Sequence, residues 1–532
     1  MSQPVRGIRG MAVAPHALAA QSALDVLRDG GNALEAAIAA AATIAVAYPH
    51  MNSIGGDAFW LIHVPGRAPK GIDACGAAAG AASIEWYAAR GITRSIPYRG
   101  GVAANTVAGA VSGWELAFRL SRKWSGRLSL KRLLADAIHY ARMGIAVTTS
   151  QSNLTAARRA ELESQAGFRE TYLDHGAAPS TGSLFRKPRL AQTLERLARA
   201  GFDDFYRGRL AQAIARDLAA TGSPLTERDL ARHRAKLVTP LALAHSLGTV
   251  YNLPPPTQGV ASLLILGILD ALGTASAGPM SADYVHLAVE ATKRAFAVRD
   301  HCVTDPAYMT LDAQGLLAPG RLRELAADID RGRAARWGGG KGPADTVWIG
   351  VADAAGRMVS TIQSLYHEFG SGVVLEETGI TWQNRGCSFA LDPAALNSLK
   401  PGRKPFHTLN SALAILRDGR TLAYGTMGGD GQPQTQAAVF TRIAAFGMDP
   451  QQAVAAPRWL LGRTWGQTTD SLKLESRFST GVVADLARRG HVMEVLGEYD
   501  ETMGHAGAIV RHANGVLDGG ADPRSDGAVA AY

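Results

Sequence analysis

The sequence predicts an α+β fold in which β-sheets are covered by layers of helices. Three strand–turn–strand units recur from Thr346 onward, over residues 346–364, 413–426 and 506–520. The last two turn at Asp-Gly and Asn-Gly pairs, which are strong hairpin signals. Helical runs lie before and between these units, and antiparallel hairpins combined with helices are typical of layered α+β proteins.

The residues before Thr346 are predicted to be mostly helical. Apolar residues recur at helical spacing from Pro15, and the Gly30-Gly31 pair ends that helix. Asn32 is placed to cap a second helix, which ends before Pro49. Alternating residues predict a strand over 59–64. Further helices are predicted over residues 128–142, 190–200, 282–298 and 434–446.

Composition places the chain among ordinary globular proteins. Of its 532 residues, 47% are hydrophobic and 19% are charged. The net charge is +9, but no compact basic run with interleaved aromatics occurs, so nucleic-acid binding is not expected. The three cysteines form no CxxC pair, so neither a metal site nor a disulfide framework is indicated.

Targeting signals are absent from the residues at the start of the sequence. "MSQPVRGIRGMAVAPHALAA" lacks the apolar core of a signal peptide. The most apolar stretch, residues 33–48, is short and contains Glu35, so it is interpreted as a buried helix and not as a membrane span. We therefore expect no membrane association, and the cytoplasm is the expected compartment.

Common cofactor and hydrolase motifs are missing. The sequence contains no HExxH, no GxSxG and no GxxxxGK[ST]. The Gly-rich stretch "GTMGGDG" over residues 425–431 lacks GxGxxG spacing. We expect neither a metal nor an organic cofactor.

Thr346 stands at an unusual junction. It begins a strand immediately after a basic, Gly-rich stretch, residues 331–344, which is predicted to be a flexible linker. A threonine hydroxyl needs a base, and an N-terminal threonine supplies its own α-amine, with a reference pKa of about 7.7–8.0. Cleavage between Asp345 and Thr346 would create that amine. Taken alone, the local sequence favours the simpler alternative that Thr346 merely begins a strand.

A resemblance that extends over most of the chain favours the interpretation of Thr346 as a nucleophile. From "GNALEAAIAAAATIAVAYPHMNSIGGDAFWLI" to the closing "GGADPRSDGAVAAY", the chain resembles the γ-glutamyltranspeptidase family of N-terminal-nucleophile hydrolases. In that family a precursor cuts itself before a threonine that heads a strand ending in Asp, as "TVWIGVAD" does. The resemblance implies a four-layer αββα sandwich built by a large subunit, residues 1–345, and an associated small subunit, residues 346–532. A dimer of such pairs is a further expectation.

The resemblance also implies roles for individual residues. Thr346 matches the nucleophile whose α-amine serves as base, and Thr361 matches a threonine that hydrogen-bonds and orients it. Gly428 and Gly429 match the pair whose backbone amides form the oxyanion hole, where the missing Cβ lets the backbone approach the substrate. Without Thr346, the glycine pair would be interpreted as a tight turn. Asn384 matches an amide of the substrate pocket.

The sequence departs from the family at the groups that grip a γ-glutamyl substrate. Cys75 and Ser388 stand where the family has an arginine and an aspartate, and His407 and Thr408 replace a pair of serines. The two lost charge-assisted contacts correspond to about 1.5–3 kcal/mol each. The segment 364–372 is expected to reshape the pocket wall. The catalytic groups are therefore expected to be retained, and the γ-glutamyl clamp lost.

Arg385 is the candidate for a replacement anion site. It falls at a pocket position where the family has a neutral residue, and a guanidinium there could hold a carboxylate bidentately. The alternative is a surface arginine in a loop. His407 is the other group in this region with a possible positive charge.

The sequence therefore predicts a self-processing amidohydrolase acting on a small amide that bears a carboxylate. Divergent family members include oxamate amidohydrolase and acylases that act on glutaryl-type side chains, and oxamate is the specific candidate. Three alternatives stay open: a γ-glutamyl transferase or glutathione hydrolase with a rebuilt clamp, a glutaryl-type acylase, and an uncleaved binding protein without activity.

Overall fold

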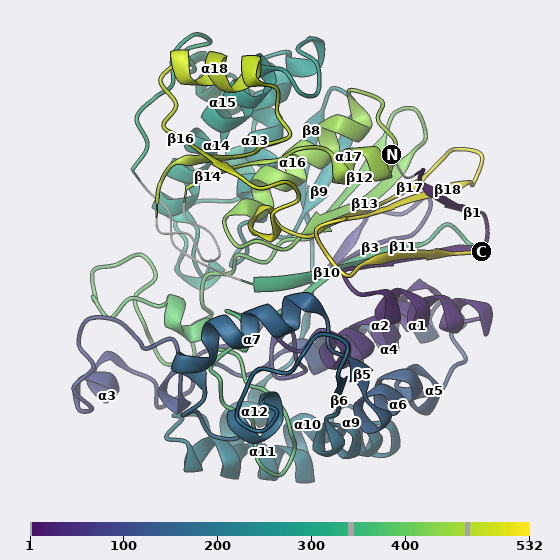
Figure 1. Cartoon of the computed structure of the whole chain (residues 1–532), viewed down its shortest axis with the longest axis vertical. Helices are drawn as coiled ribbons and strands as arrows, with labels where there is room; N and C mark the ends of the chain where they lie inside the picture. The colour runs from purple at the N-terminus through teal and green to yellow at the C-terminus, as the bar shows by residue number, and fades with distance from the viewer. Residues whose placement is uncertain (1–2, 339–344, 463–468) are drawn as a thin grey trace.

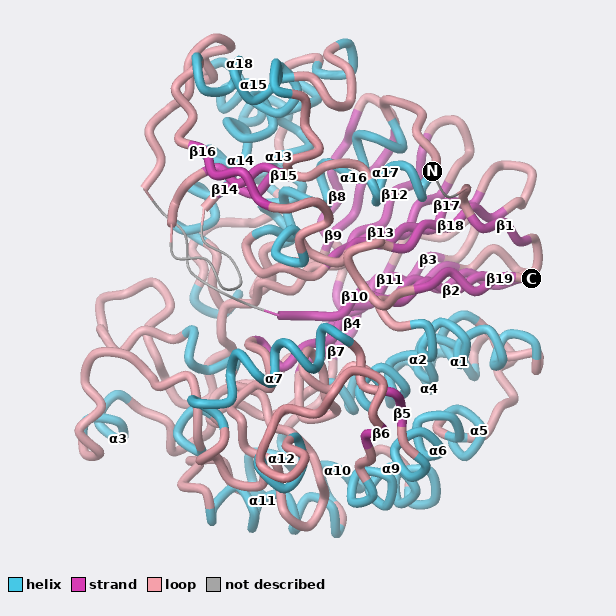
Figure 2. The backbone as a smooth tube through the Cα atoms, in the orientation of Figure 1, coloured by secondary structure: helices cyan, strands magenta, loops and turns pink. Residues whose placement is uncertain are grey.

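Two large antiparallel sheets lie face to face, with helices on both outer faces (Figures 1 and 2). The computed structural model describes residues 3–338, 345–462 and 469–532. The predicted four-layer αββα sandwich is confirmed. Among the described residues, no helix has the length and apolar character needed to cross a membrane.

Each sheet has seven strands. In spatial order, the first sheet consists of β1 (Val5–Gly7), β18 (Leu517–Ala521), β17 (Ala506–Arg511), β13 (Thr421–Thr426), β12 (Ala412–Leu416), β9 (Gly248–Asn252) and β8 (Leu241–His245). The second consists of β19 (Ala528–Ala531), β2 (Gly10–Ala14), β10 (Asp345–Asp353), β11 (Met358–Tyr366), β3 (Asp57–His63), β4 (Lys70–Ala74) and β7 (Lys236–Val238). Two small sheets contain β14 (Trp459–Leu461), β15 (Leu472–Glu475) and β16 (Met493–Leu496), and β5 (Ile145–Ala146) with β6 (Leu184–Phe185).

Helices cover both outer faces of the sandwich (Figure 1). The helices on the side of the second sheet are α1 (Ala17–Arg28), α2 (Ala33–Ala47), α3 (Ile84–Ala88), α4 (Ala110–Arg122), α5 (Leu130–Leu133), α6 (Ala135–Met143), α7 (Thr149–Leu162), α8 (Phe168–Tyr172), α9 (Pro188–Ala200), α10 (Asp204–Arg207), α11 (Arg209–Ala220) and α12 (Glu227–Arg232). The layer on the first sheet contains α13 (Gly259–Ala271), α14 (Ala282–Cys302), α15 (Pro319–Ala327), α16 (Gly431–Ala444), α17 (Pro450–Ala455) and α18 (Thr480–Arg488).

The apolar helix α2 forms as its sequence predicts. Asn32 accepts hydrogen bonds from the first-turn amides, and the Glu35 side chain accepts from the Asn32 amide, which completes a capping box. All its residues are buried, because α2 contacts α1, α4 and α6 as well as β10 and β11. The expected buried helix is confirmed.

Strand β10 lies inside the second sheet and shows two faces. Val347, Ile349 and Val351 belong to the core shared with the helices around α2, whereas Trp348 belongs to the core between the two sheets. This alternation follows from the two-residue period of a strand. The face of β10 that carries Trp348 therefore points toward the first sheet.

The three hairpins predicted after Thr346 are β10–β11, β12–β13 and β17–β18. They do not form a sheet of their own, because each large sheet combines strands from residues 1–345 with strands from residues 346–532. The proposed division into two subunits stays a prediction. Any such subunits would share both sheets.

Part of the predicted linker is held in place. The Ala334 amide donates to the Arg489 carbonyl at 2.8 Å, and the Lys293 ammonium donates to the Ala335 carbonyl at 2.6 Å. The prediction of a flexible segment is therefore wrong for Ala334 and Ala335, because their backbone groups are hydrogen-bonded to Arg489 and Lys293. Residues 339–344 lie outside the described residues.

Candidate active site

Thr346 is the second residue of β10 and is fully buried. Strand pairing is irregular at this point, because the register with β11 shifts between Asp345 and Val347. Asp345 pairs with Tyr366, so the predicted cleavage site lies where β10 and the end of β11 meet. The hydroxyl oxygen of Thr346 accepts a hydrogen bond from Gln432 at 3.3 Å.

The structure places Thr361 away from Thr346. Thr361 lies opposite Ile349 on the helix-facing side of the sheet, and its hydroxyl donates to the Phe59 carbonyl at 3.0 Å. It does not make the hydrogen bond to Thr346 that the resemblance implied. The physical reason is the two-residue period of the strand, which puts Thr361 on the opposite face.

Ser364 is the hydroxyl residue on the correct face. Trp348 donates its indole N–H to Ser360 at 2.9 Å, so Ser360 and Ser364 face the first sheet together with Trp348. Ser364 is buried close to the end of β11, where the register shifts beside Thr346. Ser364 is not among the residues expected from the sequence, although counting in steps of two from Thr346 and Trp348 along the hairpin could have found it.

Gly428 and Gly429 lie immediately before α16, which begins at Gly431. Their φ angles of +119° and +53° are in the region that favours glycine. Gln432, in the first turn of α16, bonds to Thr346, so the nucleophile candidate lies at the amino-terminal end of this helix. The helix dipole favours negative charge there. The role of the two glycines as oxyanion donors stays a prediction.

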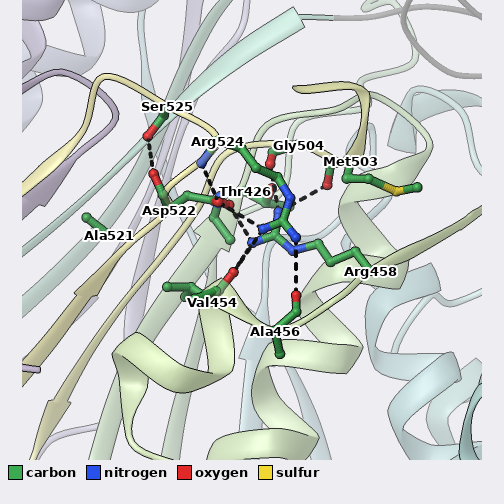
Figure 3. Close-up of polar contacts among 12 residues, drawn as sticks. Thr426, Val454, Ala456, Arg458, Met503, Gly504, Ala521, Asp522, Arg524 and Ser525 are labelled. Atoms are coloured by element: carbon green, nitrogen blue, oxygen red, sulfur yellow. Dashed lines mark hydrogen bonds and ion pairs between the residues drawn. The ribbon is translucent and has the colours of Figure 1, made fainter. Parts of the chain in front are cut away.

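A buried ionic network around Arg458 and Asp522 holds the loop that contains Gly504 (Figure 3). Arg458 donates to the carbonyl oxygens of Gly504 at 2.6 Å and Met503 at 3.1 Å, and it also pairs with Asp522. Burial would raise the pKa of Asp522, but Arg458 and Arg524 hold it below its ordinary value. The network thus fixes the position of Gly504.

Gly504 in turn packs against the end of β13. A Cβ atom built on Gly504 would lie 2.4 Å from the carbonyl oxygen of Met427. Met427 directly precedes Gly428, so the contact limits how far the glycine loop can move.

Arg385 is completely buried, so the alternative of a surface arginine is wrong. Its Nη1 atom donates to the Thr408 hydroxyl at 3.2 Å, and its guanidinium lies 3.9 Å from the centre of the Tyr366 ring. Nε and Nη2 have no hydrogen-bond partner among the described residues. Burial lowers the pKa of Arg385 from its ordinary value, although nearby Tyr366 and Asp57 favour the charge. The unpaired Nε–Nη2 edge has the geometry that binds a carboxylate bidentately.

Asp57 and His407 form a buried pair near Arg385. One oxygen of Asp57 accepts from the amides of Gly76 at 3.0 Å and Gly109 at 2.9 Å, and the other lies 3.3 Å from His407 Nε2. Burial raises the pKa of Asp57 to about 6. Burial, and then the charge of Arg385, lower the pKa of His407 well below its ordinary value. Burial and Arg385 therefore both disfavour a positive charge on His407.

Asn384 holds the wall of the pocket. Its side-chain oxygen accepts from the His367 amide at 3.1 Å, and its side-chain nitrogen donates to the Tyr98 carbonyl at 2.8 Å. Both ends of the amide are thus used within the protein. A direct contact of Asn384 with substrate stays a prediction.

A cavity of about 320 Å³ is lined by residues that contact Arg385, although Arg385 itself is not part of the lining. Its lining includes both residues that contact the guanidinium, together with Ser388 from the altered clamp; the lining residues are Tyr98, Tyr366, His367, Cys387, Ser388, Ala390, Ala395, Leu396, Asn397, Phe406 and Thr408. Cys75 lines a different cavity, beside Lys404 and Asp305. The two altered clamp positions therefore line different cavities.

Among the described residues, His286, Glu290 and His491 have the spacing of a metal site. Their atoms are already engaged: Glu290 accepts from Lys293 at 2.6 Å, and the two imidazoles lie 2.8 Å apart in a hydrogen bond. The Lys293 ammonium would also repel a cation. This cluster is a hydrogen-bonded network and not a fitting metal centre.

Comparisons with known proteins identify the relatives of this chain. The family model described as gamma-glutamyltranspeptidase matches residues 19–532. The chain is 59% identical to the oxamate amidohydrolase proenzyme of Klebsiella pneumoniae over 98% of both chains. It is 40% identical to a glutathione hydrolase-like proenzyme of Bacillus subtilis over 99% of both chains.

The fold has a solved counterpart at high similarity. The crystal structure of cephalosporin acylase from Bacillus halodurans superposes with a TM-score of 0.90 and 34% sequence identity, covering 100% of this chain and 97% of the other. A family match over nearly the whole chain, combined with this structural agreement, establishes the relationship. The chain belongs to the gamma-glutamyltranspeptidase family.

Proposed function

We propose that this chain is the precursor of an amidohydrolase that acts on a small, carboxylate-bearing amide, with oxamate as the leading candidate. The Klebsiella relative is named an oxamate amidohydrolase proenzyme. Maturation takes place by cleavage between Asp345 and Thr346, which gives Thr346 a free α-amine. The buried, open edge of Arg385 is the observation that carries the substrate assignment.

Processing uses the same hydroxyl as catalysis. The Thr346 oxygen attacks the carbonyl carbon of Asp345, and the peptide C–N bond breaks to leave an ester and the free Thr346 amine. Water then hydrolyses the ester, which frees the Asp345 carboxylate and restores the hydroxyl. The helix terminus at α16 favours the negative charge that develops on the attacked carbonyl oxygen.

In the mature enzyme, the α-amine of Thr346 accepts the hydroxyl proton while the oxygen attacks the substrate amide carbon. The amine then returns the proton to the departing nitrogen, so ammonia leaves a primary amide. Hydrolysis of the acyl-enzyme releases the acid. Gly428 and Gly429 supply the oxyanion donors in this proposal.

Arg385 fixes the substrate carboxylate. Its guanidinium rests on Tyr366, and Tyr366 pairs with Asp345 across the hairpin. The anion site and the scissile bond therefore lie at the same end of β10 and β11. A buried guanidinium with two open donors is costly until an anion occupies it, which favours binding of a charged substrate.

The test is a panel of amides assayed for ammonia release by the processed protein. We expect oxamate to be hydrolysed and its neutral counterpart, oxamide, to be a poor substrate. We expect little release of nitroaniline from γ-glutamyl-p-nitroanilide, because Cys75 and Ser388 replace the charged clamp. Efficient, glycylglycine-stimulated release would contradict the proposal and favour a rebuilt γ-glutamyl site.

One observation favours a second candidate. The cavity of about 320 Å³ that Tyr366 and Thr408 line exceeds the needs of oxamate and falls at the lower end of the range for drug-sized ligands. An acylase that accepts a longer acyl chain with a terminal carboxylate would use this space. Glutaryl amides in the same panel distinguish the two, since preference for glutaryl over oxamate would identify the acylase.

A further inference from the structure

Gln432 contacts the reacting oxygen of the proposed nucleophile. It lies in the first turn of α16 and is completely buried. Its Nε2 atom lies 3.3 Å from the hydroxyl oxygen of Thr346, and its Oε1 atom lies 3.1 Å from the backbone nitrogen of Asn410. The Gln432 side chain thus connects Thr346 with the backbone at Asn410, two residues after Thr408.

The orientation of the Gln432 amide is fixed by its second partner. A backbone N–H can only donate, so the atom facing Asn410 must be the carbonyl oxygen. The atom facing Thr346 must then be the NH₂ group. It follows that Thr346 accepts this hydrogen bond on a lone pair, and its own proton is directed elsewhere.

We propose that Gln432 is a catalytic residue that activates Thr346 by donating to its hydroxyl oxygen. This role rests on the proposed function, because it requires Thr346 to be the nucleophile. As the hydroxyl proton leaves, negative charge develops on the oxygen, and a hydrogen bond from a neutral amide becomes a charge-assisted one. The same donor serves self-cleavage and substrate hydrolysis, since both begin with the same oxygen.

The substitution Gln432→Leu removes the donor with little change in volume. We expect the rate of self-cleavage and the kcat for oxamate each to fall on the order of 10- to 100-fold, with KM nearly unchanged, because the contact strengthens in the transition state. Gln432→Glu keeps an oxygen for Asn410 and replaces the donor to Thr346 with an acceptor. This variant should be as slow as Gln432→Leu, although its packing is preserved.

Gln436→Leu is the matched control. Gln436 lies one turn further along α16, is equally buried, and donates to the Asn410 carbonyl at 2.8 Å without contacting Thr346. The Gln436→Leu protein should process and hydrolyse at rates close to wild type. Its melting temperature should be comparable to that of the Gln432→Leu protein. Cleavage and kcat of both Gln432 variants within twofold of wild type would overturn the assignment and leave the proposed function standing. A wild-type chain that stays intact would overturn both.

Discussion

At the scale of single residues, the proposed specificity rests on Arg385, whose guanidinium is buried and whose Nε and Nη2 atoms have no hydrogen-bond partner among the described residues. Replacing Arg385 with Gln should raise KM for oxamate about 10- to 100-fold, because a charged hydrogen-bonding partner of the carboxylate is lost. Self-cleavage should continue, since it does not require a bound substrate. Steady-state kinetics on the processed variant provide the measurement.

Arg403→Gln is the control for this prediction. Arg403 is also buried, but its terminal nitrogens already donate to Ser398, Thr304 and Leu396. Its replacement should affect stability more than KM. An Arg385→Gln enzyme with the kcat/KM of wild type would show that the open edge does not bind substrate.

Asp57 gives a prediction about pH. Its pKa rises from 3.8 to about 6 in the folded protein because of burial. The native state therefore keeps a proton that the unfolded state loses, so this group's contribution to stability falls as pH rises from about 4 to 6. The difference corresponds to on the order of 3 kcal/mol.

Asp57→Asn removes this titration and retains an oxygen for the Gly76 and Gly109 amides. The melting temperature of the variant should rise relative to that of wild type between pH 4 and pH 7. Above pH 7 the difference between the two melting temperatures should stay constant. A gap that stays constant over the whole range would show that Asp57 is ionised throughout.

The residue assignments differ in how far sequence could determine them. Thr346 could be predicted, since the linker, the strand and the wider resemblance agree on it. The place of Thr361 in a motif predicts that it orients the nucleophile. The side of β11 on which each residue lies favours Ser364 for this role instead. Gln432 could not be predicted, because its contact with Thr346 joins residues that are far apart in the sequence.

At the scale of elements, the glycine loop before α16 depends on a neighbouring loop that the Arg458 network holds. Gly504 has a φ of +84°, and a Cβ there would meet the Met427 carbonyl at 2.4 Å. Gly504→Ala should therefore lower stability and reduce kcat, because the Gly428–Gly429 loop must shift. Thermal melting and steady-state kinetics of the processed variant test both effects.

Gly490→Ala separates the effect of backbone strain from the effect of the contact with Met427. Gly490 has a similar φ of +92° but open space where a Cβ would lie. This control should lose stability through backbone strain, on the order of 1–2 kcal/mol, and keep its kcat. Equal kcat values for the two variants would mean that the contact with Met427 does not position the catalytic loop.

Elements were predictable where the signal is local. The Asp418-Gly419 and Asn514-Gly515 turns identified two hairpins, and Asn32 with Glu35 identified the start of α2. The order of strands in the sheets was not predictable, because it depends on pairing between distant segments such as β1 with β18.

At the scale of the whole molecule, the two proposed subunits are interleaved. Each sheet contains strands from both sides of the proposed cleavage site, and β10 pairs with β2 of the other part. We expect the cleaved parts to co-elute in gel filtration and to separate only in denaturant. Separation under native conditions would contradict the shared-sheet architecture.

The measurement that tests the central claim most directly is intact-protein mass spectrometry of the purified wild-type chain and its Thr346→Ala variant. Wild type should give two masses, corresponding to residues 1–345 and 346–532. The variant should give one full-length mass and no amidase activity, and Thr346→Ser should still cleave because the hydroxyl remains. An uncut wild-type chain that hydrolyses oxamate, or a Thr346→Ala variant that still cleaves at this bond, would contradict the account.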